Sequence, residues 1–390
     1  MTGDSCDILV IGSGPAGLAT AIVAARLGFD TVLVDEGCPN PVVDPRGQSV
    51  ALMPSARDRL IDMELWDTLE PASVPIARVR VQDVATGMDH LYRAKDLDRA
   101  ALAYAIDGRA LWQGLDRAAS DEPKLRRRPG PLVDVDLHAG WRRGILRDGS
   151  VVDARLVVGA DGRDSTVREA AALTARRSDL PELALVFQIR GTALENETII
   201  EQLRANGPLS ILPLGGDRFA VNWVDGPNQT ERRLRGGATT LGELAEALSR
   251  PGVADMTLLG GLSTYRLGVL HADRYVAPRL VLVGEAAHGA QPVHAQGFNL
   301  AVGDVHELAT LWRVEGPRFA TQDVLARYQH VRRLASATRL GTTDVMNRLF
   351  TVGNAPWAFD RGSVSRTVLD EQQPLVAETS SDDRTATRPN

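Results

Sequence analysis

The chain is poor in cysteine and contains no long apolar run. Its two cysteines, Cys6 and Cys38, are too few in 390 residues for a disulfide framework, and a reducing compartment suits them best. No uninterrupted apolar run approaches the ~20 residues that span a bilayer, and the acidic, polar start of the chain is unlike a signal peptide. We therefore expect a cytoplasmic protein. Association with a membrane stays open, because an amphipathic patch leaves no such signal.

An excess of positive charge is also absent. The formal net charge is −6, and clusters of arginine are interleaved with acids, which disfavours a nucleic-acid partner. The hydrophobic content of 44% and the charged content of 24% are those of an ordinary globular protein. The length gives room for two or three domains with large cores. Monomer and homodimer both stay open.

The N-terminal segment predicts a strand, a helix and a second strand. Asp7 to Ile11 is a short apolar strand, and Leu18 to Leu27 reads as a helix that Gly28 ends. Thr31 to Val34 is the second buried strand, and two acids follow it. This order is a βαβ unit.

A glycine loop joins the first strand to the helix. Its first glycine permits a tight turn, its second lets backbone N–H groups approach a pyrophosphate, and its third lets the helix pack against the strand. Phosphates are favoured at a helix N-terminus, and an acid after the second strand would hold a ribose. The pattern predicts a dinucleotide site, either FAD or NAD, against a glycine turn without a ligand. The residues expected here are Gly12, Ser13, Gly14, Pro15, Ala16, Gly17, Asp35 and Glu36.

Two later motifs decide between the dinucleotides. One is Gly159-Ala160-Asp161-Gly162-Arg163-Asp164-Ser165, and the other is Gly284-Glu285-Ala286-Ala287-His288, which runs on to Gln296-Gly297-Phe298-Asn299. Together with the glycine loop, they resemble the aromatic-ring hydroxylase class of FAD monooxygenases, which is p-hydroxybenzoate-hydroxylase-like. Within it the chain is most similar to the ubiquinone-biosynthesis hydroxylase family, over about Cys6 to Phe350.

The resemblance implies an α/β fold. A Rossmann-like FAD-binding domain of the GR2 type would occupy residues 1–172 and 265–350, with an inserted, mainly antiparallel β-sheet domain at 173–264 for the substrate. Strand patterns at Leu185 to Arg190, Leu209 to Leu214 and Arg218 to Val224 favour that sheet. We expect the C-terminal extension, residues 351–390, to be partly disordered, because its final part is polar and lacks aromatic residues.

The resemblance also implies roles for site residues. Glu285 would hold the ribityl or pyrophosphate region, and Pro292 would lie beside the isoalloxazine ring. The backbone N–H groups of Gly297 and Phe298, at a helix start, would face the flavin N1/C2 carbonyl, where a helix dipole stabilises negative charge. The cofactor-binding residues expected beyond the glycine loop are Arg46, Arg109, Val133, Asp161, Gly162, Gly284, Glu285, Pro292, Gln296, Gly297, Phe298 and Asn299.

The implied activity is that of an FAD-dependent monooxygenase. It would hydroxylate an aromatic substrate, a phenol or a prenylated quinone precursor, through a flavin C4a-hydroperoxide, with O2 and with NAD(P)H as a transient co-substrate. The cofactor carries the hard step, so no catalytic side chain is predicted. Phe187, Pro213 and Trp223 are candidate substrate-pocket residues, with plain core packing as an equal alternative.

Other assignments stay open or are disfavoured. A reductase of the same fold and a non-catalytic FAD-binding partner in a biosynthetic complex are the alternative functions. No metal site is predicted, because the spacing of His288, His294 and His306 matches no standard signature. We interpret the acid pair Asp304 and Glu307 as solvent-facing helix residues.

Overall fold

A computed structural model describes residues 4–35, 48–192, 194–248, 256–289 and 296–351. Within these residues, none of the helices combines the length and the apolar composition that crossing a bilayer requires. Expected residues Glu36, Arg46 and Pro292 lie outside the described part of the chain, as does His294. The α-helices are α1 (Pro15–Arg26), α2 (Pro54–Asp62), α3 (Trp66–Leu69), α4 (Gly108–Ser120), α5 (Thr166–Ala170), α6 (Pro227–Gly236), α7 (Ala238–Leu248), α8 (Gln296–Glu315) and α9 (Gln322–Thr351).

The first sheet has a parallel centre. Its order is β17-β18-β11-β1-β2-β8, and β1 pairs in parallel with both β11 and β2. The side chains of Ile8 to Ile11 are completely buried, as expected for a strand with a layer on each face. The strands are β1 (Asp4–Ile11), β2 (Thr31–Asp35), β8 (Leu125–Pro129), β9 (Leu132–His138), β10 (Trp141–Leu146), β11 (Val151–Gly159), β17 (Val276–Ala277) and β18 (Leu280–Leu282).

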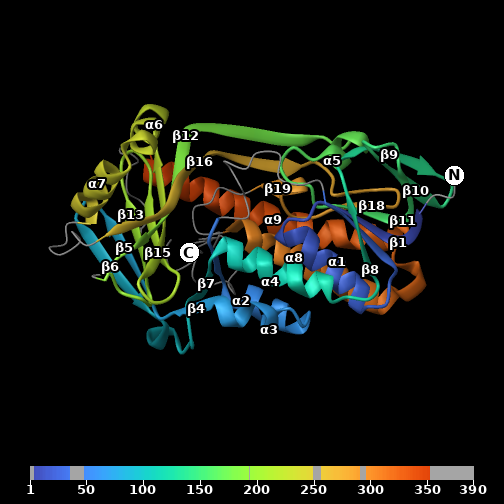
Figure 1. The fold of residues 1–390 in the computed structure, drawn as a ribbon, viewed down its shortest axis with the longest axis horizontal. Helices are drawn as coiled ribbons and strands as arrows, with labels where there is room; N and C mark the ends of the chain where they lie inside the picture. The colour runs from blue at the N-terminus through green and yellow to red at the C-terminus, as the bar shows by residue number, and fades with distance from the viewer. Residues whose placement is uncertain (1–3, 36–47, 193, 249–255, 290–295, 352–390) are drawn as a thin grey trace, which may run out of the picture. The chain divides into compact units, whose positions relative to one another are not determined.

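Helix α1 connects β1 to β2 and contacts α4 and α8 (Figure 1). It ends at Arg26 because Gly28 adopts φ +95°, a conformation that costs glycine little. The N–H of Gly28 donates to the Ala25 carbonyl, and the N–H of Phe29 donates to that of Ala24, so the last carbonyls of the helix are satisfied. The predicted βαβ unit and its glycine cap are present.

The second sheet is mainly antiparallel and runs in the order β19-β16-β12-β15-β14-β13-β5-β6. Its two longest strands, β12 and β16, pair along most of their 16 residues. Strands β5 and β6 come from the segment that the sequence assigned to the FAD-binding domain, so this sheet draws on both sides of the expected boundary at residue 173. The division of the chain into domains stays a prediction. The strands are β5 (Arg78–Asp83), β6 (Met88–Arg93), β12 (Ala175–Arg190), β13 (Thr198–Leu203), β14 (Leu209–Pro213), β15 (Arg218–Asp225), β16 (Thr257–Ala272) and β19 (His288–Gly289).

A small third sheet completes the fold. Strand β7 (Ala103–Ile106) pairs with β3 (Val50–Leu52) on one side and with β4 (Ser73–Ile76) on the other. Helix α4 follows β7, and Asp107 caps its start by accepting a hydrogen bond from the N–H of Ala110 at 3.0 Å. This connection brings α4 beside α1 and the glycine loop.

Candidate cofactor and substrate site

The glycine loop, Gly12 to Gly17, is tightly packed at two of its glycines and open at the third. A Cβ atom on Gly17 would lie 1.8 Å from the Gly12 carbonyl oxygen, and one on Gly12, at φ +103°, would lie 2.5 Å from the Ala160 oxygen. At Gly14 a Cβ would meet nothing within 4 Å. The open position is at the start of α1, so the loop fits a pyrophosphate that approaches the backbone there.

Polar contacts hold the glycine loop in place. The Ser13 hydroxyl donates to the Asp35 carboxylate at 2.5 Å, and the Trp112 indole N–H donates to the Ser13 carbonyl at 2.9 Å. Pro15 is the first residue of α1, where its missing N–H costs nothing. Trp112 was not predicted from the sequence. Arg109 is exposed on the first turn of the same helix, α4.

The second motif places a carboxylate beside the glycine loop. One oxygen of Asp161 accepts a hydrogen bond from the Val167 N–H at 3.0 Å, while its Oδ1 is buried without a partner among the described residues. Burial raises the pKa of Asp161. Gly162 has φ +83° with open space around it. Val133, on β9, is 52% exposed. An orphaned acceptor and an open glycine at one turn fit a bound ligand.

The third motif packs on the starts of α1 and α8. A Cβ on Gly284 would lie 3.2 Å from the Ala16 side chain, so only a small residue fits there. Glu285 is exposed and pairs with Arg163 at 3.4 Å. Helix α8 begins at Gln296, and a Cβ on Gly297 would meet nothing within 4 Å. An open backbone at a helix start fits the predicted flavin contact.

Two expected residues of this helix turn inward. The Phe298 side chain is partly buried and packs against the hydrophobic core around the first sheet. The Asn299 amide donates to the Ala51 carbonyl at 2.9 Å and accepts from the Met53 N–H at 2.8 Å. The Asn299 side chain therefore joins the start of α8 to the end of β3.

A buried charged cluster lies behind the third motif. Asp304 is fully buried, which corrects the expectation of a solvent-facing acid. Its carboxylate lies 2.6 Å from His288 Nε2, accepts from Arg332 Nε at 2.8 Å and accepts from the Gly284 N–H at 2.9 Å. Burial would raise the pKa of Asp304, but the charges of His288 and Arg332 lower it overall. Within the described ranges, no group of three or more His, Cys, Asp or Glu residues is arranged to hold a metal.

The second sheet has two faces of different character. Helix α7 covers one face, and Phe187 and Trp223 are buried there together with Leu244 of α7, at 5% and 2% exposure. Pro213 shares this face by strand alternation with Ile211. The structure therefore places the three substrate candidates in the core of the sheet and not against the FAD-binding motifs, which is the packing alternative.

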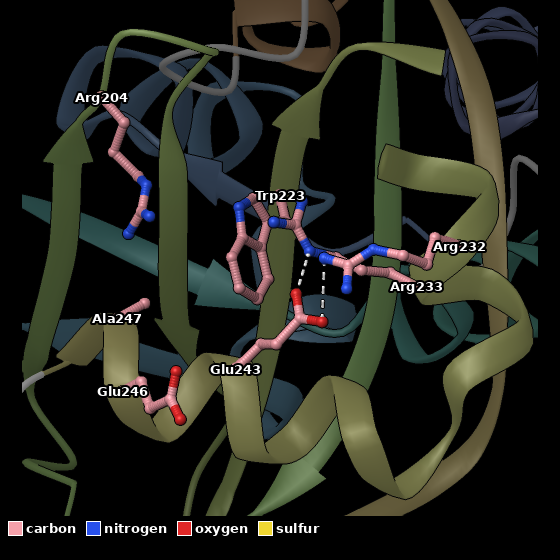
Figure 2. Close-up of a pocket in the computed structure, with 7 residues that line it drawn as sticks. All are labelled: Arg204, Trp223, Arg232, Arg233, Glu243, Glu246 and Ala247. Carbon is pink, nitrogen blue, oxygen red and sulfur yellow. Dashed lines mark hydrogen bonds and ion pairs between the residues drawn. The ribbon is translucent and has the colours of Figure 1, made fainter. Parts of the chain in front are cut away.

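A pocket of about 480 Å³ opens on the α7 side, as Figure 2 shows. Trp223 forms part of its wall, with the Arg233 guanidinium 3.9 Å from the ring centroid. Arg232 and Arg233 both pair with Glu243, and Arg233 also pairs with Asp225 at 2.7 Å. Ion pairs within the chain satisfy most of this charge, so we assign the pocket no ligand.

The opposite face, which we call the FAD-side face, carries Val186, Gln188, Glu201, Ser210, Leu212, Ala220, Asn222 and Tyr265. The Gln188 side chain hydrogen bonds to Asp107 at the start of α4, and Arg163 of the second motif donates to the Gly268 carbonyl of β16 at 2.8 Å. These contacts orient the face toward the FAD motifs. These eight side chains are partly exposed.

A row of polar side chains crosses this face. The Ser210 hydroxyl donates to the Glu201 carboxylate at 2.6 Å, Ser210 lies opposite Asn222, and Asn222 is hydrogen bonded to Tyr265. Asn222 Oδ1 is buried and has no partner among the described residues. Tyr265 lies on β16, whose Gly268 carbonyl accepts a hydrogen bond from Arg163 of the second motif. In the sequence, the sign of this polar row is the carboxylate of Glu201 within the largely apolar strand β13, Thr198–Leu203.

Glu201 predicts an unusual pH dependence of stability. Burial raises its pKa to about 7, above the ordinary 4.5. The folded state therefore holds this proton more tightly than the unfolded chain, and the stability it provides is lost as pH rises through about 7. We expect Glu201→Gln to raise the free energy of unfolding by about 1–3 kcal/mol more at pH 8 than at pH 5, in urea titrations. Glu231→Gln, on exposed α6, is the control, and an equal effect at both pH values would refute the assignment.

Comparisons with known proteins agree with this geometry. A family model described as "FAD binding domain" matches residues 141–342, which is more than half of the chain, and a second with the same description matches residues 7–43. The ubiquinone hydroxylase UbiL of Rhodospirillum rubrum is 32% identical over 92% of this chain and 86% of that protein. The 3-demethoxyubiquinol 3-hydroxylase of Escherichia coli is 29% identical over 86% of this chain and 87% of that protein.

Solved structures share the fold. The p-nitrophenol 4-monooxygenase PnpA of Pseudomonas putida superposes with a TM-score of 0.75 at 18% identity, over 94% of this chain and 93% of that one. PqsL of Pseudomonas aeruginosa, a probable FAD-dependent monooxygenase, gives 0.74 at 20% identity, over 94% and 100%. They confirm the predicted α/β fold. With the family model and the sequence relatives, the open glycines at Gly14 and Gly297 lead to one conclusion: the chain belongs to the FAD-dependent hydroxylase family of the ubiquinone hydroxylases.

Proposed function

We propose that the protein hydroxylates the ring of a phenolic substrate, with FAD as the resident cofactor and NAD(P)H and O2 as co-substrates. The observation that carries the proposal is the similarity to UbiL along 92% of the chain. It includes the second sheet, where a substrate would be bound, as well as the FAD motifs. The open glycine positions and the orphaned oxygen of Asp161 support the presence of a ligand at those motifs.

Each FAD motif would bind one part of the cofactor. Backbone N–H groups at the start of α1 would hold the pyrophosphate, and Asp35 would accept hydrogen bonds from a ribose. The start of α8, at Gly297 and Phe298, would stabilise negative charge on the flavin ring. FAD, when bound, supplies electron transfer from NAD(P)H and the activation of O2. The protein's own task is then to orient the substrate and keep water out.

The FAD-side face of the second sheet is the proposed substrate wall. It combines apolar side chains, among them Val186 and Leu212, with the polar row that ends at Glu201. A flat aromatic ring with one hydroxyl group suits a wall of that composition. The names of the relatives favour a quinone precursor within this class.

Oxygen incorporation tests the proposal directly. The FAD-loaded protein is mixed with NADH or NADPH and a panel of phenol, 4-hydroxybenzoate, 4-nitrophenol and 2-allylphenol. We expect at least one phenol to accelerate NAD(P)H oxidation, by about 10-fold or more, because substrate binding orients the reacting groups. Under ¹⁸O2 the product should gain one labelled oxygen atom. Reduction of substrate without label would favour the reductase, and bound FAD without any oxidation of NAD(P)H would favour the non-catalytic partner.

A further inference from the structure

We propose that Glu201, held by Ser210 on the FAD-side face of the second sheet, binds the hydroxyl group of the phenolic substrate and accepts its proton. This inference rests on the proposed function and names the side chain that prepares the substrate. It assigns a catalytic role to a residue of β13, outside the three FAD motifs. The polar row described above is the geometry on which it stands.

The first argument is position. Glu201 pairs across the sheet with Ser210, and Ser210 pairs with Asn222, so all three side chains point to the same face. On that face, Gln188 is bound to Asp107 at the start of α4, whose Trp112 supports the glycine loop. At the other side, Tyr265 lies on β16, three residues before Gly268, whose carbonyl accepts a hydrogen bond from Arg163 at 2.8 Å. The carboxylate is therefore on the face of the sheet that Gln188 joins to the start of α4.

The second argument is that the Glu201 carboxylate and Asn222 Oδ1 can accept more hydrogen bonds than the described residues donate to them. Ser210 donates its hydroxyl to Glu201, which fixes the carboxylate but neutralises none of its charge. Among the described residues, no lysine or arginine forms an ion pair with Glu201. Asn222 Oδ1, across from Ser210, is buried and accepts nothing from the described residues. A ligand with hydroxyl groups would supply donors to both acceptors, which an apolar ligand would not.

The third argument is chemistry. When a phenol donates to ionised Glu201, its O–H bond breaks, the proton moves to the carboxylate and the electron pair stays on the phenol oxygen. The resulting phenolate ring is richer in electrons and reacts faster with an electrophilic oxygen. Burial of Glu201 raises its pKa to about 7, which brings it closer to that of a phenol and favours the transfer. The proton is released to water when the product leaves.

Other titratable groups face the same region and must be separated from Glu201 in a pH profile. On the FAD-side face and the layer packed against it, they are Asp83, His90, Tyr92, Asp107, Arg218 and Tyr265. Burial raises the pKa of Tyr265 far above neutrality, so it does not titrate near pH 7. A pH response near neutrality that disappears in Glu201→Gln, with His90 unchanged, is therefore specific to Glu201.

The experiment compares Glu201→Gln with the wild type and with Glu231→Gln, a matched change on exposed α6. The substrate is whichever phenol of the panel stimulates the wild type most. We expect Glu201→Gln to keep its FAD content and to lose about 100-fold in kcat/KM together with the acid limb near pH 7. Ser210→Ala should move that limb to higher pH, because it removes a hydrogen bond to the ionised form.

A series of phenols of decreasing pKa gives a readout that a merely structural role would not change. In Glu201→Gln the kcat/KM should recover as the phenol becomes more acidic, with 4-nitrophenol the least affected, because an ionised substrate needs no base. Loss of activity that is equal for all phenols, or a variant within about 3-fold of the wild type, would overturn the inference. A wild type that no phenol stimulates would instead contradict the proposed function.

Discussion

Asp304→Asn is expected to lower the free energy of unfolding by about 3–5 kcal/mol, because it leaves the Arg332 guanidinium buried without its counter-charge. The Arg332 side chain is 8% exposed, and the Asp304 side chain is completely buried. The variant also weakens the hydrogen bond from the Gly284 N–H, so the third motif should loosen and the FAD content of the purified protein should fall. Urea titrations of the FAD-loaded protein measure the first effect, and the visible spectrum measures the second.

The chain offers a matched control for this change. Asp62 also lies between a histidine and an arginine, His306 at 3.1 Å and Arg313 at 2.9 Å, but its side chain is 53% exposed. Asp62→Asn should therefore cost only about 0–1 kcal/mol. If the two substitutions cost the same, burial does not govern the strength of these clusters, and the role given to Asp304 is wrong.

The second large effect is expected at the glycine loop. Gly14→Ala should leave the apoprotein folded, because the added Cβ meets no protein atom within 4 Å, yet it should weaken FAD binding by about 100-fold. The methyl group would occupy the space through which the pyrophosphate approaches the backbone. Fluorescence titration with FAD and the melting temperature of the apoprotein separate the two properties.

Gly17→Ala should behave differently. Its Cβ would lie 1.8 Å from the Gly12 carbonyl oxygen, so the loop cannot keep its conformation even without a cofactor. We expect a lower melting temperature of the apoprotein in addition to the loss of FAD binding. Wild-type FAD affinity in Gly14→Ala would show that the phosphates do not approach at that residue and would contradict the assigned site.

The FAD motifs could be predicted because their constraints are local. The turn at Gly12, the open position at Gly14 and the helix end at Gly28 each depend on a few consecutive residues, and glycine is selected there for a conformation or a close approach. The same holds for the predicted helix start at Gln296. Such features depend on short stretches of sequence, so the tertiary fold does not change them.

The substrate wall could not be predicted in this way. Strands β12 and β15 carry apolar side chains on both faces. The alternation of apolar and polar residues along them therefore does not predict which face α7 covers. The choice of aromatic residues selected Phe187 and Trp223, which are buried in the core under α7. The wall proposed above is on the other face, where Asn222 lies. The FAD-side face is identified by contacts between residues far apart in the chain, such as that of Gln188 with Asp107.

The burial of Asp304 could have been predicted from its position in helix α8. Asp304 lies at helical spacing from Ala301 and Leu308, which both face the core, so periodicity alone places it on the buried side of α8. Its charge argued for solvent, because ionised side chains are seldom buried without partners. Those partners, His288 and Arg332, come from other elements, and their approach depends on the tertiary fold.

The order in which the chain is synthesised has a consequence for how the site is completed. Strand β11 is synthesised long before its parallel neighbour β18. Ala51 and Met53 are likewise made long before Asn299, whose side-chain amide forms hydrogen bonds with their backbone. Strand β10 pairs with the first half of β11, so until β18 is made only the segment at Val157 to Gly159 lacks its neighbour, and an unpaired strand edge can join other chains. Since β18 and the start of α8 lie close together in the chain, the edge of β11 is covered at about the stage of synthesis at which the proposed flavin contact on α8 can first form.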